Sequence, residues 1–374
     1  MVRHILVGLL MLWGGLGLEG CRASARRGDA LPSPSSRPAG WIAFIRDGKV
    51  WVMRPDGRQV RPLTATGECS SPAISPDGRR VAFVLRQGEE SDLYLVDIVG
   101  GEPCRLTQDL DVCQPVWSPQ GQHLSYLRLP AADEPEQEPV ELWQPAVLRN
   151  LREEVHFEQF QGSDAPQFLN EDTLFLIQTD EDAAIRAFWR LQLDSSAGEQ
   201  VALPHVDFDP YFCHPALSPD GQKLAYVSLS PHGEGHCIQT LAGEILVRWG
   251  PHPPLESDAP FAMPLWSPDG QWVLFDHTDL SDPQVAGLWV TDAKSGQSRR
   301  ILAATADWNA PRRLHLTGCS WSPDSRKLAL GIAETSGFGE KEKTLLFIAV
   351  VDVATGQVTR LAENAAEPSW GGED

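Results

Sequence analysis

The chain has 374 residues and a mass of 41.1 kDa, and 42% of its residues are hydrophobic, which is enough apolar material for a core. Its 51 acidic residues against 31 basic ones give a formal charge of −20. This charge argues against a nucleic-acid binder, because phosphate recognition needs clustered Lys and Arg. The 30 Pro, 32 Gly and 13 Trp indicate short aromatic-rich strands joined by tight turns and exclude a mainly disordered chain.

Residues 1–20 are predicted to be a secretory signal peptide. Arg3 and His4 give a short basic start, and the apolar run 5–18 is shorter than the roughly 20 residues that a membrane span needs. The run leads to Leu18-Glu19-Gly20-Cys21, which resembles the bacterial lipobox except at Glu19. That resemblance implies that Cys21 is lipidated and becomes the new N-terminus. An uncleaved anchor and an ordinary secretory signal are the alternatives.

Residues 21–40 are predicted to be a flexible tether, because Pro, Ser, Gly and Ala dominate and no apolar periodicity is present. Four Arg and one Asp give this tether a net charge of +3, whereas the following segment 41–374 is strongly acidic. A basic tether suits an anionic membrane surface. A disordered spacer with incidental charge is an equally good interpretation.

From Trp41 onward the sequence repeats a short strand, a turn of the Ser-Pro-Asp-Gly type and an apolar strand. Pro fixes φ at about −65°, Asp bonds to nearby backbone, and Gly tolerates the left-handed conformation. Steps of 43, 49 and 55 residues separate neighbouring copies, and the 100 residues after Ser118 leave room for two units. The turns begin at Ser75, Ser118, Ser218, Ser267 and Ser322, with a decayed copy at 168–172.

Each repeat supplies four short antiparallel strands. A unit of this size cannot bury both of its faces alone, so the units are expected to stack around an axis as an all-β β-propeller. Trp117, Trp266 and Trp321 precede the turn on the innermost strand of their units, where a large ring can fill the gap between blades.

The two chain ends are expected to share one blade. Residues 41–64 supply only three strands, and the missing innermost strand is found at Pro368-Ser369-Trp370. Pairing of the N- and C-terminal strands would close the ring and remove two free sheet edges. The count then predicts seven four-stranded blades, or six if the stretch 130–204 forms a single blade.

The repeats resemble those of the TolB-like propellers, relatives of the WD-type propellers. The residues that carry the resemblance are Pro72-Ala73-Ile74-Ser75-Pro76-Asp77-Gly78, Pro115-Val116-Trp117-Ser118-Pro119 and Pro264-Leu265-Trp266-Ser267-Pro268-Asp269-Gly270. The resemblance covers nearly all of 41–374 and implies a fold more than a function, because the motif is a structural turn. TolB itself has an additional N-terminal α/β domain where this chain is predicted to have a tether, so an assignment to the Tol system does not follow.

The mouth of the central channel is the predicted binding site for a ligand or partner. By repeat position, the residues expected there are Asp111, Gln114, Asp164, His214 and Glu367. A solvated acidic rim is the structural alternative. No G-x-S-x-G elbow, P-loop or dinucleotide fingerprint occurs, so no catalytic residue and no cofactor are predicted.

Seven Cys are present, and six remain once the lipid acceptor is removed. An even number outside the cytoplasm permits disulfides, and neighbouring blades could bring Cys69 and Cys113 together. Free thiols are the equal alternative. His232, His236 and Cys237 cluster in a Gly-rich stretch that is interpreted as an exposed loop, so no metal site is predicted.

The sequence therefore predicts a non-enzymatic, lipid-anchored propeller of the bacterial cell envelope that serves as a protein-interaction platform. It would be an extracytoplasmic monomer, on the outer membrane or the periplasmic face in a Gram-negative cell, with envelope proteins as partners. The alternative is a propeller enzyme or small-molecule binder that uses the channel mouth.

Overall fold

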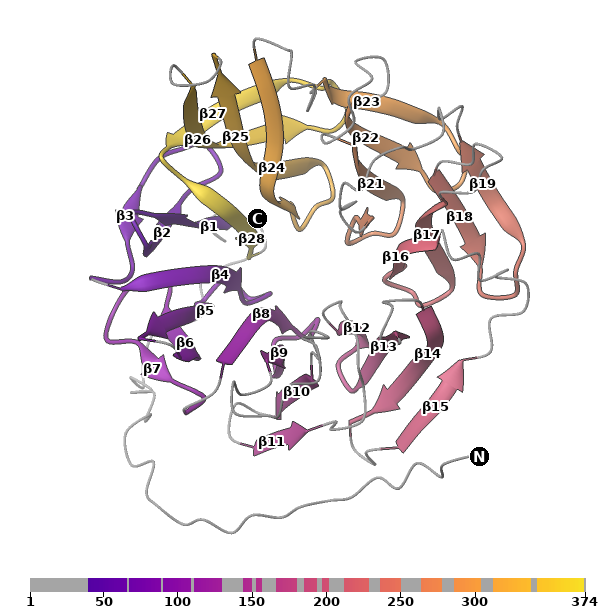
Figure 1. Cartoon of the computed structure of the whole chain (residues 1–374), viewed down its shortest axis with the longest axis horizontal. Helices are drawn as coiled ribbons and strands as arrows, with labels where there is room; N and C mark the ends of the chain where they lie inside the picture. Colours follow the sequence, from indigo (N-terminus) through magenta and orange to yellow (C-terminus); the bar gives the residue numbers. More distant parts are fainter. Residues whose placement is uncertain are drawn as a thin grey trace, which may run out of the picture.

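The structure is a computed structural model, and the residues that it describes are 40–65, 67–88, 90–108, 111–129, 144–149, 153–156, 166–179, 185–193, 197–201, 212–228, 236–249, 264–277, 286–303, 312–337 and 342–372. The predicted signal peptide, the predicted tether up to residue 39, and Asp164 lie outside these ranges. The described part of the chain is all strand and turn, arranged as sheets around a central axis (Figure 1).

Short antiparallel hairpins follow one another along the chain, as the alternation of apolar strands and Pro/Gly turns predicts. The strands are β1 (Trp41–Arg46), β2 (Lys49–Met53), β3 (Arg61–Pro62), β4 (Glu68–Ile74), β5 (Arg80–Gln87), β6 (Glu90–Asp97), β7 (Cys104–Arg105), β8 (Asp111–Trp117), β9 (His123–Leu129), β10 (Gln144–Arg149), β11 (Glu153–His156), β12 (Gln167–Asn170), β13 (Thr173–Thr179), β14 (Ile185–Gln192), β15 (Ala197–Val201), β16 (Phe212–Leu217), β17 (Lys223–Ser228), β18 (His236–Thr240), β19 (Ile245–Trp249), β20 (Leu265–Trp266), β21 (Trp272–His277), β22 (Gly287–Asp292), β23 (Ser298–Ala303), β24 (Arg312–Trp321), β25 (Lys327–Ser336), β26 (Lys343–Asp352), β27 (Val358–Glu363) and β28 (Ala366–Gly371).

The described strands form six hydrogen-bonded sheets. Four of them are consecutive four-stranded sheets, β12–β15, β16–β19, β20–β23 and β24–β27, and a fifth has the order β28-β1-β2-β3. The sixth is eight-stranded, because β4–β7 and β8–β11 are joined through a parallel pair of Ser91 in β6 with Asp111 in β8.

The blade count is thus six, one blade being double, and the expectation of seven separate blades is corrected to the alternative count. The sequence suggested that a count of six would arise if the stretch 130–204 formed one blade, but the structure reaches six in another way. The stretch 130–204 contributes to two sheets, whereas β6 is long enough for Ser91 to reach the first residue of β8. One backbone pair is sufficient to merge two repeat units into one sheet.

Both chain ends contribute to one sheet. β28 pairs antiparallel with β1, and the register sets Trp41 against Gly371 and Ile42 against Trp370. The innermost strand that residues 41–64 lack is therefore supplied by the C-terminal segment, as the repeat arithmetic predicted.

The Ser-Pro-Asp-Gly turns have one geometry. In the first, Ser75 Oγ donates to Asp77 Oδ1 at 2.6 Å, and the backbone N–H of Arg79 donates to the same oxygen at 3.1 Å. The serine–aspartate bond recurs at 2.5–2.6 Å in the turns that begin at Ser218, Ser267 and Ser322. These aspartates are thereby assigned to turn structure rather than to chemistry.

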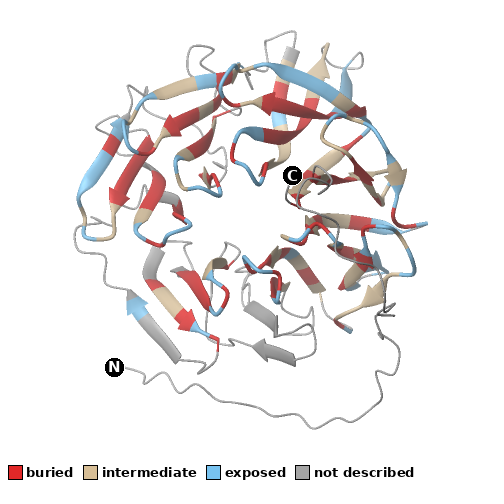
Figure 2. Ribbon diagram, turned by 180° about the vertical axis from the view of Figure 1, so that it is seen from behind, coloured by how far each residue is buried: buried red, intermediate tan, exposed pale blue. Residues whose placement is uncertain are grey.

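Neighbouring sheets pack face to face through separate apolar clusters. One cluster joins β21 and β22 to β25 and β26 around Trp321, and another joins β1 and β2 to β4 and β5. Buried residues concentrate within the sheets, whereas turns and outer strands are more exposed (Figure 2). Each sheet hides its apolar faces only against its neighbours, so burial depends on the whole ring.

Candidate functional site

The innermost strands share a β-bulge. The register shifts at equivalent places in β4, β8, β16, β24 and β28. In three of them the bulged residue is not Gly yet has a positive φ and precedes Pro: Ser71 (49°), Gln114 (50°) and Glu367 (51°). Non-glycine residues seldom adopt this conformation. Bulges re-aim side chains and are frequent beside functional sites, so this repeated feature marks the channel-lining strands as the candidate site.

The structure places two of the predicted site residues at equivalent bulge positions. Gln114 is exposed, whereas Glu367 is half-buried. Asp111 does not share that position: it begins β8, pairs with Leu129, and forms the parallel pair with Ser91. The backbone of His214 lies at the bulge of β16, but its side chain, like all of Asp164, lies outside the description.

Glu367 is engaged in holding two blades together. Its Oε2 accepts a hydrogen bond of 2.6 Å from the backbone N–H of Ser71 in the next sheet. Two residues further on, Ser369 Oγ accepts from the N–H of Ile74 at 3.0 Å. A carboxylate that satisfies a backbone donor in this way has a structural role, which removes Glu367 as a free catalytic group.

Similar links connect the other innermost strands. The indole N–H of Trp117 donates to the Ala73 carbonyl at 2.9 Å, that of Trp266 to Ala216 at 2.9 Å, and that of Trp321 to Leu265 at 3.1 Å. Each of the predicted gap-filling tryptophans therefore also ties its innermost strand to the innermost strand of the preceding repeat. The bulges are consequently held by a rigid frame, which is the requirement for a preorganised binding surface.

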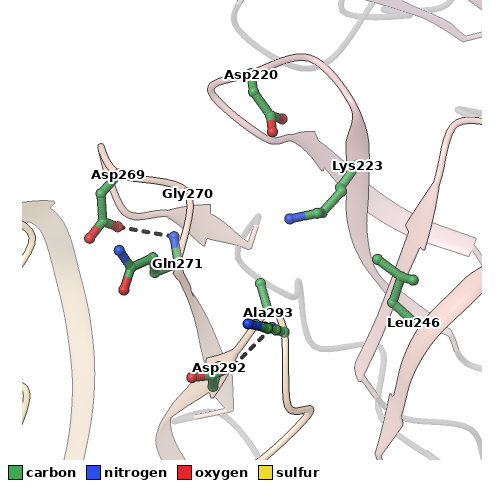
Figure 3. A pocket seen from close by; sticks show the side chains of 9 residues that line it. Asp220, Lys223, Leu246, Asp269, Gly270, Gln271, Asp292 and Ala293 are labelled. Carbon is green, nitrogen blue, oxygen red and sulfur yellow. Dashed lines mark hydrogen bonds between the residues drawn. The ribbon is translucent and has the colours of Figure 1, made fainter.

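A polar groove of about 660 Å³ lies at the other end of the ring, between the sheets β16–β19 and β20–β23 (Figure 3). We call this end the turn face, because the Ser-Pro turns lie there, and the opposite end the mouth face. Sequence reasoning missed the groove, because it forms between turns of different repeats. Its lining includes Asp220, Lys223, Leu246, Asp269, Asp292 and Lys294.

Two carboxylates of this groove, those of Asp220 and Asp292, are ionised at neutral pH. Desolvation raises the pKa of Asp220, but hydrogen bonds from the Ser218 hydroxyl and the Gln222 N–H outweigh it and lower the pKa. The N–H groups of Ser295 and Lys294 lower the pKa of Asp292. A general acid must hold a proton at its working pH, so neither carboxylate is suited to that role.

The possible disulfide between Cys69 and Cys113 is not formed, because neither residue is disulfide-bonded. Cys69 is buried between its own sheet and the sheet that contains β2, where its Sγ lies 3.8 Å from Oγ1 of Thr64, the residue that bonds to Val50 of β2. Burial raises the pKa of the Cys69 thiol, with the Thr64 hydrogen bond opposing that shift. The disulfide-bonded cysteine among the described ones is Cys104, which the repeat positions did not single out.

His236 and Cys237 are not in a loop, which corrects the interpretation of that stretch. They begin β18 and are completely buried. Nε2 of His236 contacts Nε2 of His277 in the next sheet, and the ring of Phe275 stacks on His236 with centroids 3.7 Å apart. Two facing imidazole nitrogens can share one proton, so this pair is a buried polar link between blades. Its members come from non-equivalent strands, which sequence spacing does not reveal.

In the described ranges, no three His, Cys, Asp or Glu side chains are grouped so that they could hold a metal ion. The same part of the chain contains no helix of the length and apolar character that crossing a membrane requires.

No protein-family model matches the chain. The Tol-Pal system protein TolB of Anaeromyxobacter dehalogenans is 34% identical over 94 residues, which are 23% of this chain and 21% of that protein. The repeats are TolB-like. The chain thus matches about a fifth of the length of its curated TolB relatives. An uncharacterized peptidase, YuxL of Bacillus subtilis, is 35% identical over 78 residues, 20% of this chain and 12% of that protein.

Among solved structures, oligogalacturonate lyase of Vibrio parahaemolyticus superposes with a TM-score of 0.57 at 17% identity, covering 82% of this chain and 83% of that one. At this identity the likeness shows the β-propeller fold alone.

Proposed function

We propose that this protein is a non-enzymatic, lipid-anchored propeller of the cell envelope that acts as a platform for protein–protein interaction. The observation that carries the proposal is the repeated bulge, which presents Ser71, Gln114 and Glu367 at equivalent positions of a rigid ring. A surface made of such fixed positions binds a partner with little loss of conformational freedom. The TolB-like repeats support an envelope partner.

The binding surface is tested by site-specific photocrosslinking in cells. A photoreactive residue at Gln114, which is exposed at the bulge, is expected to crosslink a discrete envelope protein. The matched control is Gln122, an exposed glutamine at the turn-face end of the same hairpin. Crosslinks of equal yield from both positions, or from neither, would contradict a partner at the mouth face.

Lipid anchoring is tested at the predicted acceptor. The Cys21→Ser variant is expected to leave the membrane fraction and to lose incorporation of labelled palmitate. Unchanged labelling would refute lipidation at this residue, and the platform hypothesis would remain open to the crosslinking test.

A second candidate is a propeller enzyme or small-molecule binder at the channel mouth, favoured by the fold shared with oligogalacturonate lyase. Incubation with oligogalacturonate and other glycans decides this alternative. Turnover that disappears in the Asp111→Asn or His214→Ala variant would replace the platform hypothesis.

A further inference from the structure

Basic charge is concentrated in the N-terminal part of this acidic chain. After the tether, whose net charge is +3, residues 41–88 contain eight basic and four acidic residues. Residues 89–374 contain eighteen basic and forty-five acidic residues. The first five strands, β1–β5, and their turns therefore differ in charge sign from the rest of the chain.

The tether emerges at the turn face. A Cβ on Gly40, its last residue, would lie 2.7 Å from the Gly371 carbonyl oxygen. A Cβ on Gly78, in the turn between β4 and β5, would lie 2.8 Å from the Cα of Gly372. The root of the tether, the C-terminal glycines and the first Ser-Pro turn therefore meet at one place.

Arginines surround this place. The guanidinium of Arg54 lies 3.8 Å and that of Arg61 5.4 Å from the ring centroid of Trp41, the residue that follows the tether. Arg58, in the same turn as Arg54, has a side chain that is 84% exposed. Arg79 and Arg80 follow Gly78, and Arg79 is exposed. We call these five residues the basic collar.

Acidic residues offset part of the charge of the collar and the tether. Asp56 lies 3.6 Å from Arg58, and Asp77 is bonded within its turn by Ser75. Asp97 is paired across the sheet with Arg80, and Glu373 and Asp374 follow Gly372 in the sequence. The collar and the tether together have nine arginines against six acidic residues, a net charge of +3. An arginine-flanked tryptophan at the exit of a basic tether is the combination that membrane–water interfaces favour.

We propose that the basic collar rests on an anionic phospholipid surface, so that the turn face near the tether faces the bilayer and the mouth face points away from it. The attraction comes from arginines within a Debye length of the lipid phosphates. The anionic surface repels the acidic residues of the other blades, so those blades do not lie flat against the bilayer. The biological setting rests on the proposed lipid anchoring, but the electrostatic contact is independent of acylation.

The test measures binding of residues 21–374 carrying Cys21→Ser, which retains every described residue and cannot be lipidated. Phosphatidylcholine vesicles with about 30% phosphatidylglycerol are expected to co-sediment the protein at low salt, whereas pure phosphatidylcholine vesicles should not. The Arg58→Gln/Arg79→Gln variant should weaken partitioning about 25-fold, since each arginine near such a surface is worth about fivefold.

The matched control is Lys49→Gln/Arg86→Gln, which removes the same charge from the same sheets at the mouth face and should change partitioning less than about threefold. A tether variant with Arg22, Arg26, Arg27 and Arg37 changed to Ser should bind more weakly but keep the difference between the two pairs. Equal effects of the two pairs, or no binding to phosphatidylglycerol at low salt, would overturn the proposal. Neither result depends on whether Cys21 is acylated in the cell.

Discussion

One of the Ser-Pro turns has no aspartate of its own, and Glu171 from the next sheet supplies the carboxylate that this turn lacks. The turn Ser118-Pro119-Gln120-Gly121 has Gln where the others have Asp. Glu171, between β12 and β13, accepts from Ser118 Oγ at 2.5 Å, from the Gln120 N–H at 2.7 Å and from the Gln122 N–H at 2.9 Å. The serine and Gln122 contacts are those that Asp77 makes to its own turn through Ser75 and Arg79.

The Glu171→Gln substitution should therefore destabilise the fold. Ser118 is fully buried, and Glu171 is 8% exposed, so water cannot replace the charged acceptor fully. Hydrogen bonds to charged groups contribute about 1.5–3 kcal/mol each. The loss is smaller than their sum, because the Gln side chain keeps one oxygen acceptor and the exposed backbone N–H groups of the turn can bond to water instead. We expect a net loss of about 2 kcal/mol and, for a domain of this size, a fall in Tm of about 3 °C, measured by calorimetry.

The rescue variant separates this explanation from general damage. Adding Gln120→Asp to Glu171→Gln restores a carboxylate within the turn, so most of the lost Tm should return. Gln120→Asp alone should not stabilise, because it places a second carboxylate against Glu171. Glu102→Gln, a change of an exposed acid, is the control and should leave Tm unchanged. A Glu171→Gln variant within about 1 °C of the parent, or no rescue by Gln120→Asp, would refute the reasoning.

Three further outcomes are expected. Hydrogen bonds from Ser295 and Lys294 lower the folded pKa of Asp292 from its ordinary value of 3.8, so its ionised form stabilises the protein at neutral pH. Asp292→Asn should lower Tm at pH 7, and the difference in Tm should shrink as the pH falls below 3.8 and the carboxylate of the folded protein becomes protonated. Desolvation, with Asp276 adding to it, raises the pKa of the half-buried Cys319 to about 12. Iodoacetamide at pH 8 should therefore label this thiol much more slowly in the folded than in the unfolded protein, as read by mass spectrometry, and equal rates would contradict this. Trp266→Phe removes the donor to the Ala216 carbonyl and should cost about 1–3 kcal/mol in calorimetry, more than the same change at Trp272, whose side chain is half-buried.

The sequence alone determined the architecture, because the repeat is local. Pro, Asp and Gly at fixed offsets specify the turn, alternating apolar residues specify the strands, and Trp before the turn marks the innermost strand. The same arithmetic found that Trp370 supplies the strand missing beside Trp41, which the register of β1 with β28 shows. Gln114 and Glu367 were aligned correctly for the same reason, since each precedes Pro at one repeat position.

Tertiary structure decided what depends on contacts between repeats. The hydrogen bond from Ser71 to Glu367, the replacement of a missing turn Asp by Glu171, and the contact of His236 with His277 each join different sheets. The double blade arises from one backbone pair, Ser91 with Asp111. Cys69 and Cys113 are not disulfide-bonded although their strands share that sheet, because Cys69 packs against Thr64 of the neighbouring sheet. The sequence periodicity fixes the position of a residue within its own repeat. The residue that it contacts in the next repeat depends on how successive repeats are rotated about the axis, and the spacing of residues in the sequence does not contain that rotation.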